Sequence, residues 1–486
     1  MTNPRAVFLF VAILATGICI GASRVTALPA LPQDAKEHVT RALDSRAQRN
    51  AEIAHQIWEL AEVGYQEAKS SQLLQWELEE SGFAVESGVA DIPTAFVATY
   101  GSGEPILGIL AEFDALPGLS QAAVPERSPL ASDAGHACGH HLFGTASSAA
   151  AIAVKEWLAA THTSGTIRVY GTPAEEGGAG KVYLARAGLF DDVDVALHWH
   201  PADRNDASPG NSLANKSAKF RFHGQSTHAA AAPERGRSAL DGVEAMNHMV
   251  NLMREHMPQE ARIHYVITHG GRAPNVVPDF AEVYYYVRHP DVTSAKELFE
   301  RVTQAAEGAA LGTGTRLEYE IIHGIYNLLP NETLGRLMDA NLRRIGGVTY
   351  DEGEKRFAEM IRPTLGAIDI ALGSQAEIQP FEIKGGGGST DVGDISWLVP
   401  TAGLDAATWV PGTSAHSWQA VAAGGTSIGT KGMLLAAETL AWTAVDLFLD
   451  PTHVVASRQE LEQRRGADFV YEALVGDRDP PLDYRQ

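Results

Sequence analysis

The stretch that decides the fold begins with the motif His136-Ala-Cys138-Gly-His140-His141 and ends with the motif Pro173-Ala-Glu175-Glu176-Gly-Gly. Between the two motifs, residues 142–160 are rich in alanine and leucine and predict a helix, and residues 166–170 predict a strand. Thiolate, imidazole and carboxylate side chains are the ligands that zinc-like ions take. Because a catalytic ion keeps one position open for water, the stretch indicates a hydrolytic metal site.

Predicted helices and strands alternate on either side of this stretch. They are a helical region at 34–82, strands at 95–100 and 105–111, and a strand at 193–199 that ends at His200. The alternation predicts an α/β fold with a mostly parallel sheet and helices on both faces. Ligands of such sheets bind at the carboxyl ends of the strands, where Glu176 and His200 are both expected.

A second unit interrupts this pattern after a polar, glycine-containing segment at 203–215. Its predicted order is strand 217–222, helix 238–257, strands 262–268 and 281–287, helix 294–310 and strand 316–322. This order is that of a ferredoxin-like α+β unit. We therefore predict a catalytic domain in two parts, residues 34–211 and 328–486, with an inserted lid at 212–327. The charged, proline-containing tail after Asp450 is expected to pack loosely.

Length and charge restrict the class of protein. A chain of 486 residues with 45% hydrophobic residues is long enough for two or three domains with sizeable cores. The formal net charge of −22 argues against binding to nucleic acid, which requires a basic surface.

The N-terminal residues have the pattern of a signal peptide. Arg5 precedes an apolar run at 6–20, and Val25-Thr-Ala27 resembles a cleavage site. We predict a signal peptide at 1–27 and an exported, periplasmic or secreted protein; an uncleaved anchor is the alternative. Cys19 falls inside this segment, so the mature chain would keep only Cys138, which favours a ligand or a buried thiol over a disulfide.

Each candidate ligand also has a simpler interpretation. Cys138 and His140 are two residues apart and face the same way in an extended loop, but a buried cysteine beside a core histidine is the alternative. His136 and His141 are better explained by packing or by support of the ligands. His198 and His200 share one face of a strand, and the spacing does not choose between them. His416 lies in a loop before a long helix, where a lone histidine is usually just exposed.

The adjacent pair Glu175 and Glu176 suits a division of labour. At a strand end followed by two glycines, a turn can bring both carboxylates to one cleft. One can then bind metal while the other takes a proton from the attacking water. A solvated acidic turn is the alternative, and the nearby cysteine and histidines make it the weaker one.

Eight motifs, in order along residues 57–449, carry a resemblance to a known family. They are Ala111-Glu-Phe-Asp114-Ala-Leu-Pro117-Gly-Leu-Ser-Gln121, Gly135-His-Ala-Cys138-Gly-His140, Pro173-Ala-Glu175-Glu176-Gly-Gly, Trp199-His200-Pro201, Gly224-Gln-Ser-Thr-His228-Ala-Ala, Asn275-Val-Val-Pro278, Gly388-Ser-Thr-Asp391-Val-Gly-Asp and Ala415-His416-Ser-Trp418. The chain resembles the co-catalytic metallopeptidases that include aminoacylases, carboxypeptidase G-type enzymes and hippurate hydrolases. Within that family it is most similar to amidohydrolases of the p-aminobenzoyl-glutamate hydrolase type, in particular to the B-type subunit of such enzymes.

The resemblance implies a site with two divalent ions per subunit, zinc or manganese. It assigns the metal ligands Cys138, His140, Glu176, His200 and His416, and it makes Glu175 the general base. It prefers His200 to His198 because the family histidine falls six residues after the acidic position occupied here by Asp194.

The resemblance also implies roles for residues of the inserted unit. That unit is expected to form a homodimer, and His228 to reach the neighbouring subunit's site and stabilise an oxyanion. Asn275 and Arg288 are expected to contact the substrate. Because the resemblance is to one of two types of subunit, a subunit of the other type is a further partner to consider.

The sequence departs from the family pattern at three positions. His141 replaces a common aspartate, Thr390 replaces a common glutamate, and Glu112 stands where some branches have a histidine ligand. Asp114 keeps the aspartate of the first motif, and we interpret it as support for His140 from outside the ligand set.

The predicted function is metal-dependent hydrolysis of the amide bond of an N-acyl or N-aroyl amino acid such as p-aminobenzoyl-glutamate, or of a related dipeptide. Two alternatives differ in class. One is a dipeptidase with the same two-metal site, and the other is a periplasmic metal-binding protein without catalysis. The free carboxylate of Glu175 speaks against the second, because metal binding alone does not need it.

Overall fold

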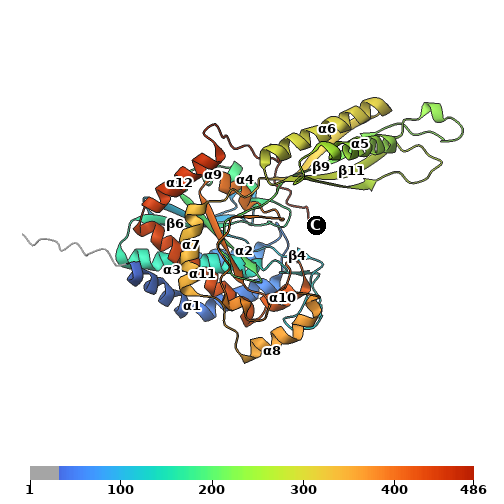
Figure 1. The fold of residues 1–486 in the computed structure, drawn as a ribbon. Coiled ribbons are helices and arrows are strands. Elements are labelled where there is room, and N and C mark those ends of the chain that lie inside the picture. The colour runs from blue at the N-terminus through green and yellow to red at the C-terminus, as the bar shows by residue number, and fades with distance from the viewer. Residues whose placement is uncertain (1–31, 486) are drawn as a thin grey trace, which may run out of the picture.

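The computed structural model describes residues 32–485 and has two units, a large α/β body and a lid that projects from it (Figure 1). The predicted signal peptide at 1–27, with Cys19, lies outside the described residues.

The body is built on a six-stranded sheet of order β1-β2-β6-β3-β7-β14. Its strands are β1 (Ala84–Ser87), β2 (Phe96–Ser102), β3 (Ile106–Ala111), β6 (Gly165–Gly171), β7 (Val195–Ala202) and β14 (Thr401–Ala407). The four strands β6, β3, β7 and β14 pair in parallel, whereas β2 is antiparallel to β6 and β1 to β2. This sheet confirms the predicted α/β class, and its antiparallel edge follows from the short connection of β2 to β3, which forms no crossover.

Helices cover both faces of this sheet, as Figure 1 shows. The first face lies under α1 (Pro32–Leu60), α3 (His140–Thr161), α7 (Glu332–Ile345) and α11 (Ser427–Leu449). The second lies under α4 (Gly180–Arg186) and α9 (Val392–Leu398). Alternate residues of one strand serve the two cores: Val169 packs with the first group of helices and Tyr170 with the second.

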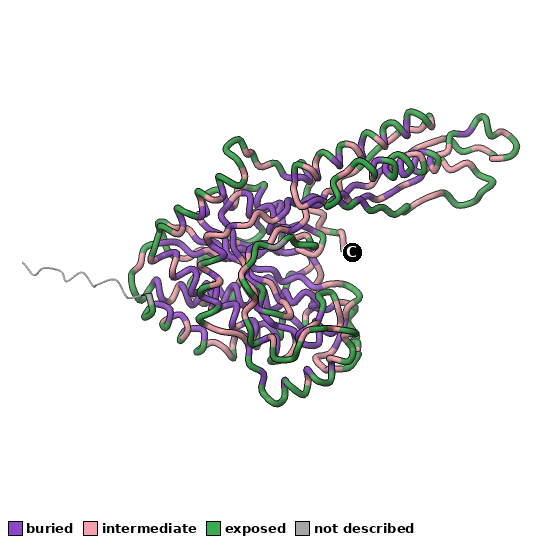
Figure 2. Tube along the Cα trace, viewed as in Figure 1, coloured by how far each residue is buried: buried purple, intermediate pink, exposed green. Residues whose placement is uncertain are grey.

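Among the described helices, α11 has the length and composition to cross a membrane, yet 78% of its most apolar window is buried inside the protein. Its contacts with α1, α3 and α7 make it a helix of the core, and the buried trace of Figure 2 runs through this region.

The lid has a four-stranded antiparallel sheet of order β10-β11-β9-β12. Its elements are β9 (Ala214–His223), α5 (Ala239–Met253), β10 (Arg262–His269), β11 (Phe280–His289), α6 (Val292–Thr313) and β12 (Arg316–Ile325). The strand order, with α5 and α6 packed on one face, is that of a ferredoxin-like unit. Strong alternation places Phe220, Val283 and Tyr285 under the helices and leaves charged side chains on the other face.

Shorter elements complete both units. They are α2 (Ala68–Glu80), β4 (Leu116–Pro117), β5 (Ala134–Gly135), β8 (Gly210–Asn211), α8 (Glu352–Ile361), β13 (Lys384–Gly385), α10 (Trp418–Gly424), α12 (Thr452–Arg465) and the 3-10 turns η1 (Val89–Asp91), η2 (Pro233–Arg235), η3 (Arg254–His256), η4 (Arg362–Leu365) and η5 (Ser374–Ala376). Of these, η2 and η3 belong to the lid.

The C-terminal segment, residues 466–485, packs against both units, so the prediction of a loosely packed tail is wrong. Leu474 is 4% exposed, and the segment passes between lid and body (Figure 1). Arg186 donates to the carbonyl oxygens of Gly476 and Arg478, both at 2.7 Å. The side chain of Arg478 in turn donates to the carbonyl of Ile322 in β12. The aromatic and aliphatic residues of the segment, spaced among charges, therefore serve as anchors that composition alone conceals.

Candidate metal centre

Gly139 brings Cys138 and His140 together. It adopts φ 76°, a left-handed conformation, and it forms the N-terminal cap of α3. A Cβ at this position would lie 2.6 Å from Pro201, so only glycine fits. The expected extended loop is therefore wrong: a tight turn at the start of a helix directs the two ligands toward one position.

The first group of candidate ligands is Cys138, His140 and His200, whose ligand atoms lie within 4.8 Å of one another. The Cys138 Sγ is 3.4 Å from His200 Nε2. His200 Nδ1 is 2.8 Å from the carbonyl oxygen of Pro201, which leaves Nε2 for an ion. Strand β7 continues to Ala202, so His200 lies inside the strand and not, as predicted, just beyond its end.

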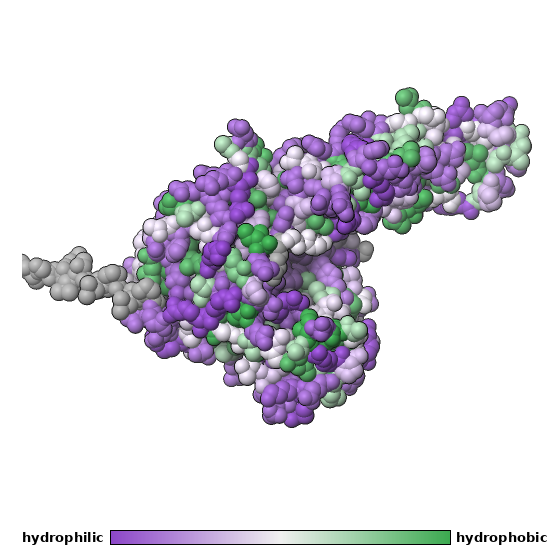
Figure 3. Space-filling view, in the orientation of Figure 1, coloured by the Kyte–Doolittle hydropathy of each residue, from purple (hydrophilic) through white to green (hydrophobic). Residues whose placement is uncertain are grey.

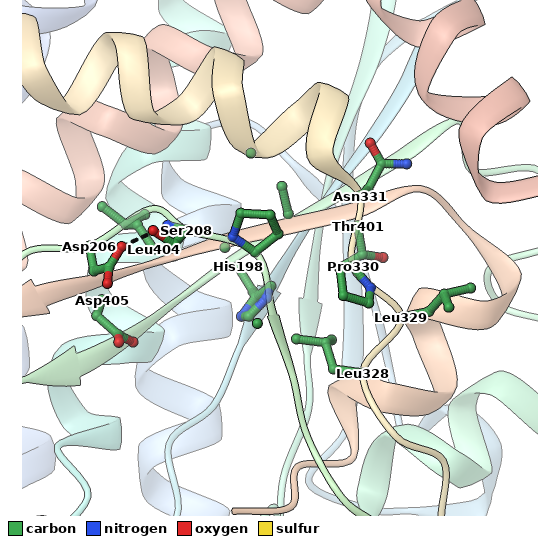
Figure 4. Close-up of a pocket in the computed structure, with 15 residues that line it drawn as sticks. His198, Asp206, Ser208, Leu328, Leu329, Pro330, Asn331, Thr401, Leu404 and Asp405 are labelled. Carbon is green, nitrogen blue, oxygen red and sulfur yellow. Dashed lines mark hydrogen bonds between the residues drawn. The ribbon is translucent and has the colours of Figure 1, made fainter. Parts of the chain in front are cut away.

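His198 lies in a different place, although it is two residues from His200 on the same strand. It lines a cavity of about 180 Å³ together with Pro209, Leu328 and Thr401 (Figure 4). Its ring packs on Gly403, where a Cβ would come 2.3 Å from Nε2. Burial lowers the pKa of His198 to about 3, with a further contribution from His200. The structure thus separates the two histidines that the spacing left open.

The second group is Cys138, Glu176 and His416, again within 4.8 Å of one another. His416 Nε2 is 2.9 Å from Glu176 Oε1. The backbone of His416 has φ 58°, and its N–H donates to the carbonyl of Ala137 at 2.9 Å. This strained residue is held in place by the cysteine motif itself, and Cys138 belongs to both groups.

Asp114 links the two groups. Its Oδ1 is 2.9 Å from His140 Nδ1, and its Oδ2 accepts the backbone N–H of Glu176 at 2.9 Å. The carboxylate is fully buried. It therefore fixes the ring of one candidate ligand and the backbone of another.

Glu175 stands apart from both groups that contain Cys138. It forms a third group with Glu112 and His140. The residue before it, Ala174, has φ 59°, and its N–H donates to the buried carboxylate of Glu67 at 2.8 Å. Burial raises the pKa of Glu175 well above its usual value, and the neighbouring carboxylates of Glu112 and Glu176 raise it further. A partly buried carboxyl with a raised pKa, next to a residue in a strained conformation, is typical of a general base.

The donor atoms fit divalent cations. His140 Nε2 is buried and has no hydrogen-bond partner among the described residues, while Nδ1 is engaged by Asp114. Burial also raises the pKa of the Cys138 thiol, so a thiolate needs a nearby cation. Sulfur, imidazole and carboxylate donors are a set that zinc and related ions accept.

His136 and His141 have backbone partners. His136 Nε2 is 3.0 Å from the carbonyl of Ile57, and His141 Nε2 is 3.1 Å from that of Gly424. Both rings are buried and lie 4.9 Å apart. They pack beneath the centre, away from its ligand atoms.

His228 and Asn275 lie together on the lid. The N–H of Ala229 donates to the carbonyl of Asn275 at 3.0 Å, and His228 forms a bridge with Val276. Both residues are exposed, and their recorded contacts are to other lid residues. Within one subunit, therefore, the structure does not bring them to the metal ligands.

Arg288 lies on the open face of the lid sheet, and its guanidinium is 5.3 Å from the ring centre of Tyr286. Burial and the charge of the nearby Arg288 lower the pKa of His323 in β12 to about 4.

Three buried residues around the centre were missed by the sequence analysis as contributors. They are Glu67, Glu112 and Lys181. A charged residue is usually exposed, so a lone Glu or Lys in the sequence carries no signal of burial.

Two ligand groups that share a thiol, beside a further, partly buried carboxyl, define a metal-dependent hydrolase at the carboxyl ends of strands. Residues 214–313 match the family model described as a peptidase dimerisation domain. The chain is 41% identical to the B-type subunit of p-aminobenzoyl-glutamate hydrolase from Escherichia coli, over 89% of this chain and 95% of that protein. It is 29% identical to the Xaa-Arg dipeptidase of Mus musculus, over 88% of this chain and 92% of that protein.

The fold is also that of a dinuclear metal-binding peptidase of the M20 family from Bacillus subtilis, with a TM-score of 0.57 and 18% identity over 84% of this chain and 99% of that one. The chain belongs to the M20 peptidase family. It is a metal-dependent enzyme that hydrolyses amide bonds, as its sequence predicted.

Proposed function

We propose that this enzyme hydrolyses the amide bond of N-aroyl or N-acyl amino acids, with p-aminobenzoyl-glutamate as the first substrate to test, and that it uses two divalent ions. The observation that carries the proposal is the partly buried carboxyl of Glu175, which lies outside the two ligand groups that share Cys138. The relative with 41% identity, matched over 95% of its length, supports the choice of substrate. The M20 neighbour described as dinuclear supports two ions, which we expect to be zinc or manganese.

The residues of the site divide the reaction between them. Cys138, His140 and His200 would hold one ion, and Cys138, Glu176 and His416 the other. When bound, such ions supply Lewis acidity toward the amide carbonyl and lower the pKa of water. Glu175 takes the proton from the attacking water at its carboxylate and delivers it to the nitrogen of the leaving amine. The raised pKa of Glu175, which burial causes, makes the carboxyl a better proton acceptor.

The lid supplies the groups that the body lacks. His228 Nδ1 accepts the N–H groups of Ala230 and Ala231 at 3.2 and 3.1 Å, so the neutral ring carries its proton on Nε2. We propose a homodimer through the lid in which this N–H donates to the oxyanion formed in the other subunit. Asn275 beside it and Arg288 would contact the substrate, the latter through a carboxylate.

A dipeptidase is the second candidate. It is favoured by the similarity to the mouse Xaa-Arg dipeptidase over 88% of this chain. The two candidates differ in the acyl side of the substrate, because a dipeptidase binds a free α-amine and an N-aroyl hydrolase accepts a substrate without one.

The decisive experiment is a profile of amide hydrolysis by the metal-reconstituted enzyme. We expect release of p-aminobenzoate from p-aminobenzoyl-glutamate. Release from p-aminobenzoyl-glutamine should be slower if the enzyme recognises the side-chain carboxylate of glutamate. Hydrolysis of lysyl-arginine but of neither aroyl substrate would replace the proposal with the dipeptidase. Full metal occupancy without turnover of any amide would leave a metal-binding protein without catalysis.

We further propose that the protein is exported after removal of residues 1–27, on the basis of Arg5, the apolar run at 6–20 and Ala27. N-terminal sequencing of the native protein should find a first residue near Leu28. A start at Met1 in a soluble cytoplasmic fraction would exclude export.

A further inference from the structure

A buried cluster of charges lies beside the metal centre and has no part in the function proposed so far. Glu112, Lys181 and Asp391 are 1%, 0% and 1% exposed. Lys181 Nζ is 2.6 Å from Glu112 Oε1 and 2.7 Å from Asp391 Oδ1. An ammonium in such a place requires a close anionic partner, because a buried charge without one is strongly destabilising.

Lys181 is fixed at both ends. Its backbone N–H, in the first turn of α4, donates to Asp391 Oδ2 at 3.0 Å, and its ammonium contacts the other oxygen of the same carboxylate. The orientation of Glu112 is therefore set by a lysine that cannot swing away. One oxygen of Glu112, Oε1, is held by this ammonium.

The other oxygen of Glu112 faces the metal centre. Oε2 is 3.2 Å from His140 Nε2, yet neither atom has a hydrogen-bond partner within residues 32–485. His140 Nδ1 is already held by Asp114, so Nε2 is the ring nitrogen left for an ion. Unless His140 is protonated and pairs with Glu112, two adjacent buried polar atoms without a hydrogen bond are costly, and a third group that contacts both removes that cost.

The spacing of these two atoms matches that of two ligands on one ion. Metal–nitrogen and metal–oxygen distances of about 2.0–2.1 Å at a tetrahedral angle place two donor atoms roughly 3.3 Å apart. Glu112 also belongs to a group of ligand atoms with His140 and Glu175 that lie within 4.8 Å of one another.

We propose that Glu112 is a further ligand of the ion that His140 binds, and that Lys181 is the residue that positions it. The inference rests on the proposed two-metal site. It gives the first ion one carboxylate donor, as Glu176 gives the second. The ammonium offsets the added charge and keeps Oε1 out of the coordination sphere.

Metal affinity of the intact protein tests this directly. Metal-free protein is titrated with Zn²⁺ in competition with a chelator, which gives the affinity of each binding step. A second titration with Co²⁺ is followed by its absorption spectrum, which reports the ligands of the ion. Glu112→Gln keeps size and can still accept from Lys181, but its amide oxygen is a poorer ligand. We expect one of the two binding steps to weaken by at least about 10–100-fold with a changed Co²⁺ spectrum, and the other step to stay as in wild type.

Asp391→Asn removes one charge from the same cluster but offers no atom to His140. Its amide nitrogen replaces one of the two oxygens that hold Lys181, so its effect acts through Lys181, and we expect it to weaken the same binding step less than Lys181→Met does. Lys181→Met should weaken the same step as Glu112→Gln, and the double variant should be no weaker than Glu112→Gln alone, because Lys181 acts through Glu112. Additive losses would overturn the positioning role.

Wild-type binding separates this inference from the proposed function. If wild type binds fewer than two ions, the two-metal proposal fails. If wild type binds two and Glu112→Gln does so with the same affinities and spectrum, Glu112 is a partner of Lys181 only. A zinc-loaded crystal structure of wild type tests the assignment even if a variant does not fold. We expect a distance of about 2.0–2.2 Å between zinc and Glu112 Oε2, and a distance beyond about 3 Å would overturn the assignment.

Discussion

The body buries charged residues, whereas the lid exposes hydrophobic ones. In the body, the charges of Glu112, Asp114 and Lys181 are buried, and the inner part of the body is largely purple in Figure 2. In the lid, hydrophobic residues are exposed: Val266 and Ile267 of the edge strand β10 are 55% and 41% exposed. Figure 3 shows such hydrophobic residues among hydrophilic ones on the lid surface.

The difference indicates what each unit binds. Buried carboxylates, imidazole and thiol are stable together only if cations compensate them, so the body is built around ions. An exposed apolar edge strand is a liability unless another surface pairs with it, so the lid is built for a protein neighbour. Each of the following predictions tests one side of this contrast.

The largest effect is expected in the body, where Glu175→Gln and Glu176→Gln should differ in kind. Glu175→Gln should keep its metals and lose turnover by on the order of 10²–10⁴, because the amide cannot accept a proton. Glu176→Gln should lose metal. Elemental analysis and initial rates on the same samples decide, and the reverse pattern would exchange the two roles.

A loss nearly as large is expected from His228→Ala, although this residue is in the lid. Loss of one oxyanion donor should lower kcat by roughly 10²–10³ while metal content stays unchanged. Glu175→Gln homodimers should be equally inactive, but a mixed dimer has one site with an intact Glu175 and an intact His228 from the partner. Subunit exchange between the two variants should therefore restore activity; demonstrated exchange without recovery would exclude action across the dimer.

Metal removal should destabilise the body more than the lid. Ligand that is present at about 1,000 times its Kd stabilises the folded state by roughly 4 kcal/mol. After chelation, hydrogen exchange should accelerate in α3 and around Ala174 and stay unchanged in β9 and β11. Equal acceleration in both units would contradict the contrast.

The smallest effect is expected at the lid edge. Val266→Lys should weaken a dimer that pairs through β10, since a charge replaces an apolar contact, by about tenfold or more in the dissociation constant. Leu311→Lys is a matched control, because Leu311 is 86% exposed on α6. Analytical ultracentrifugation measures both, and an unchanged Val266→Lys dimer would place the interface elsewhere.

The sequence predicted what depends on local pattern. The alternation in β9 and β11 and the helical period of α5 and α6 specify the lid, because each element has one buried face. The contacts of the centre depend on tertiary structure instead. The spacing of two residues between His198 and His200 does not show which of them reaches the metal centre. Their tertiary neighbours do: His198 packs on Gly403, and His200 contacts Cys138.

Burial of charge was beyond the sequence for the same reason. Glu112 and Lys181 are far apart along the chain, and neither has a periodicity that marks it as internal. The left-handed conformations of Ala174 and His416 were equally hidden, since alanine rarely adopts them and a single loop histidine does not indicate one. What the sequence did indicate was a candidate ligand set, which came from ordered motifs and a resemblance and not from geometry.

The C-terminal segment gives the protein a mechanical property. The Arg478 side chain donates a hydrogen bond to the carbonyl of Ile322 in the lid strand β12. Six and seven residues later, Tyr484 and Arg485 donate to the carbonyl of Glu176 at 3.0 and 2.6 Å. A lid that swings relative to the body must either carry this tether or release it. The angle of the lid is thereby linked, within one chain, to the peptide bond beside a candidate metal ligand.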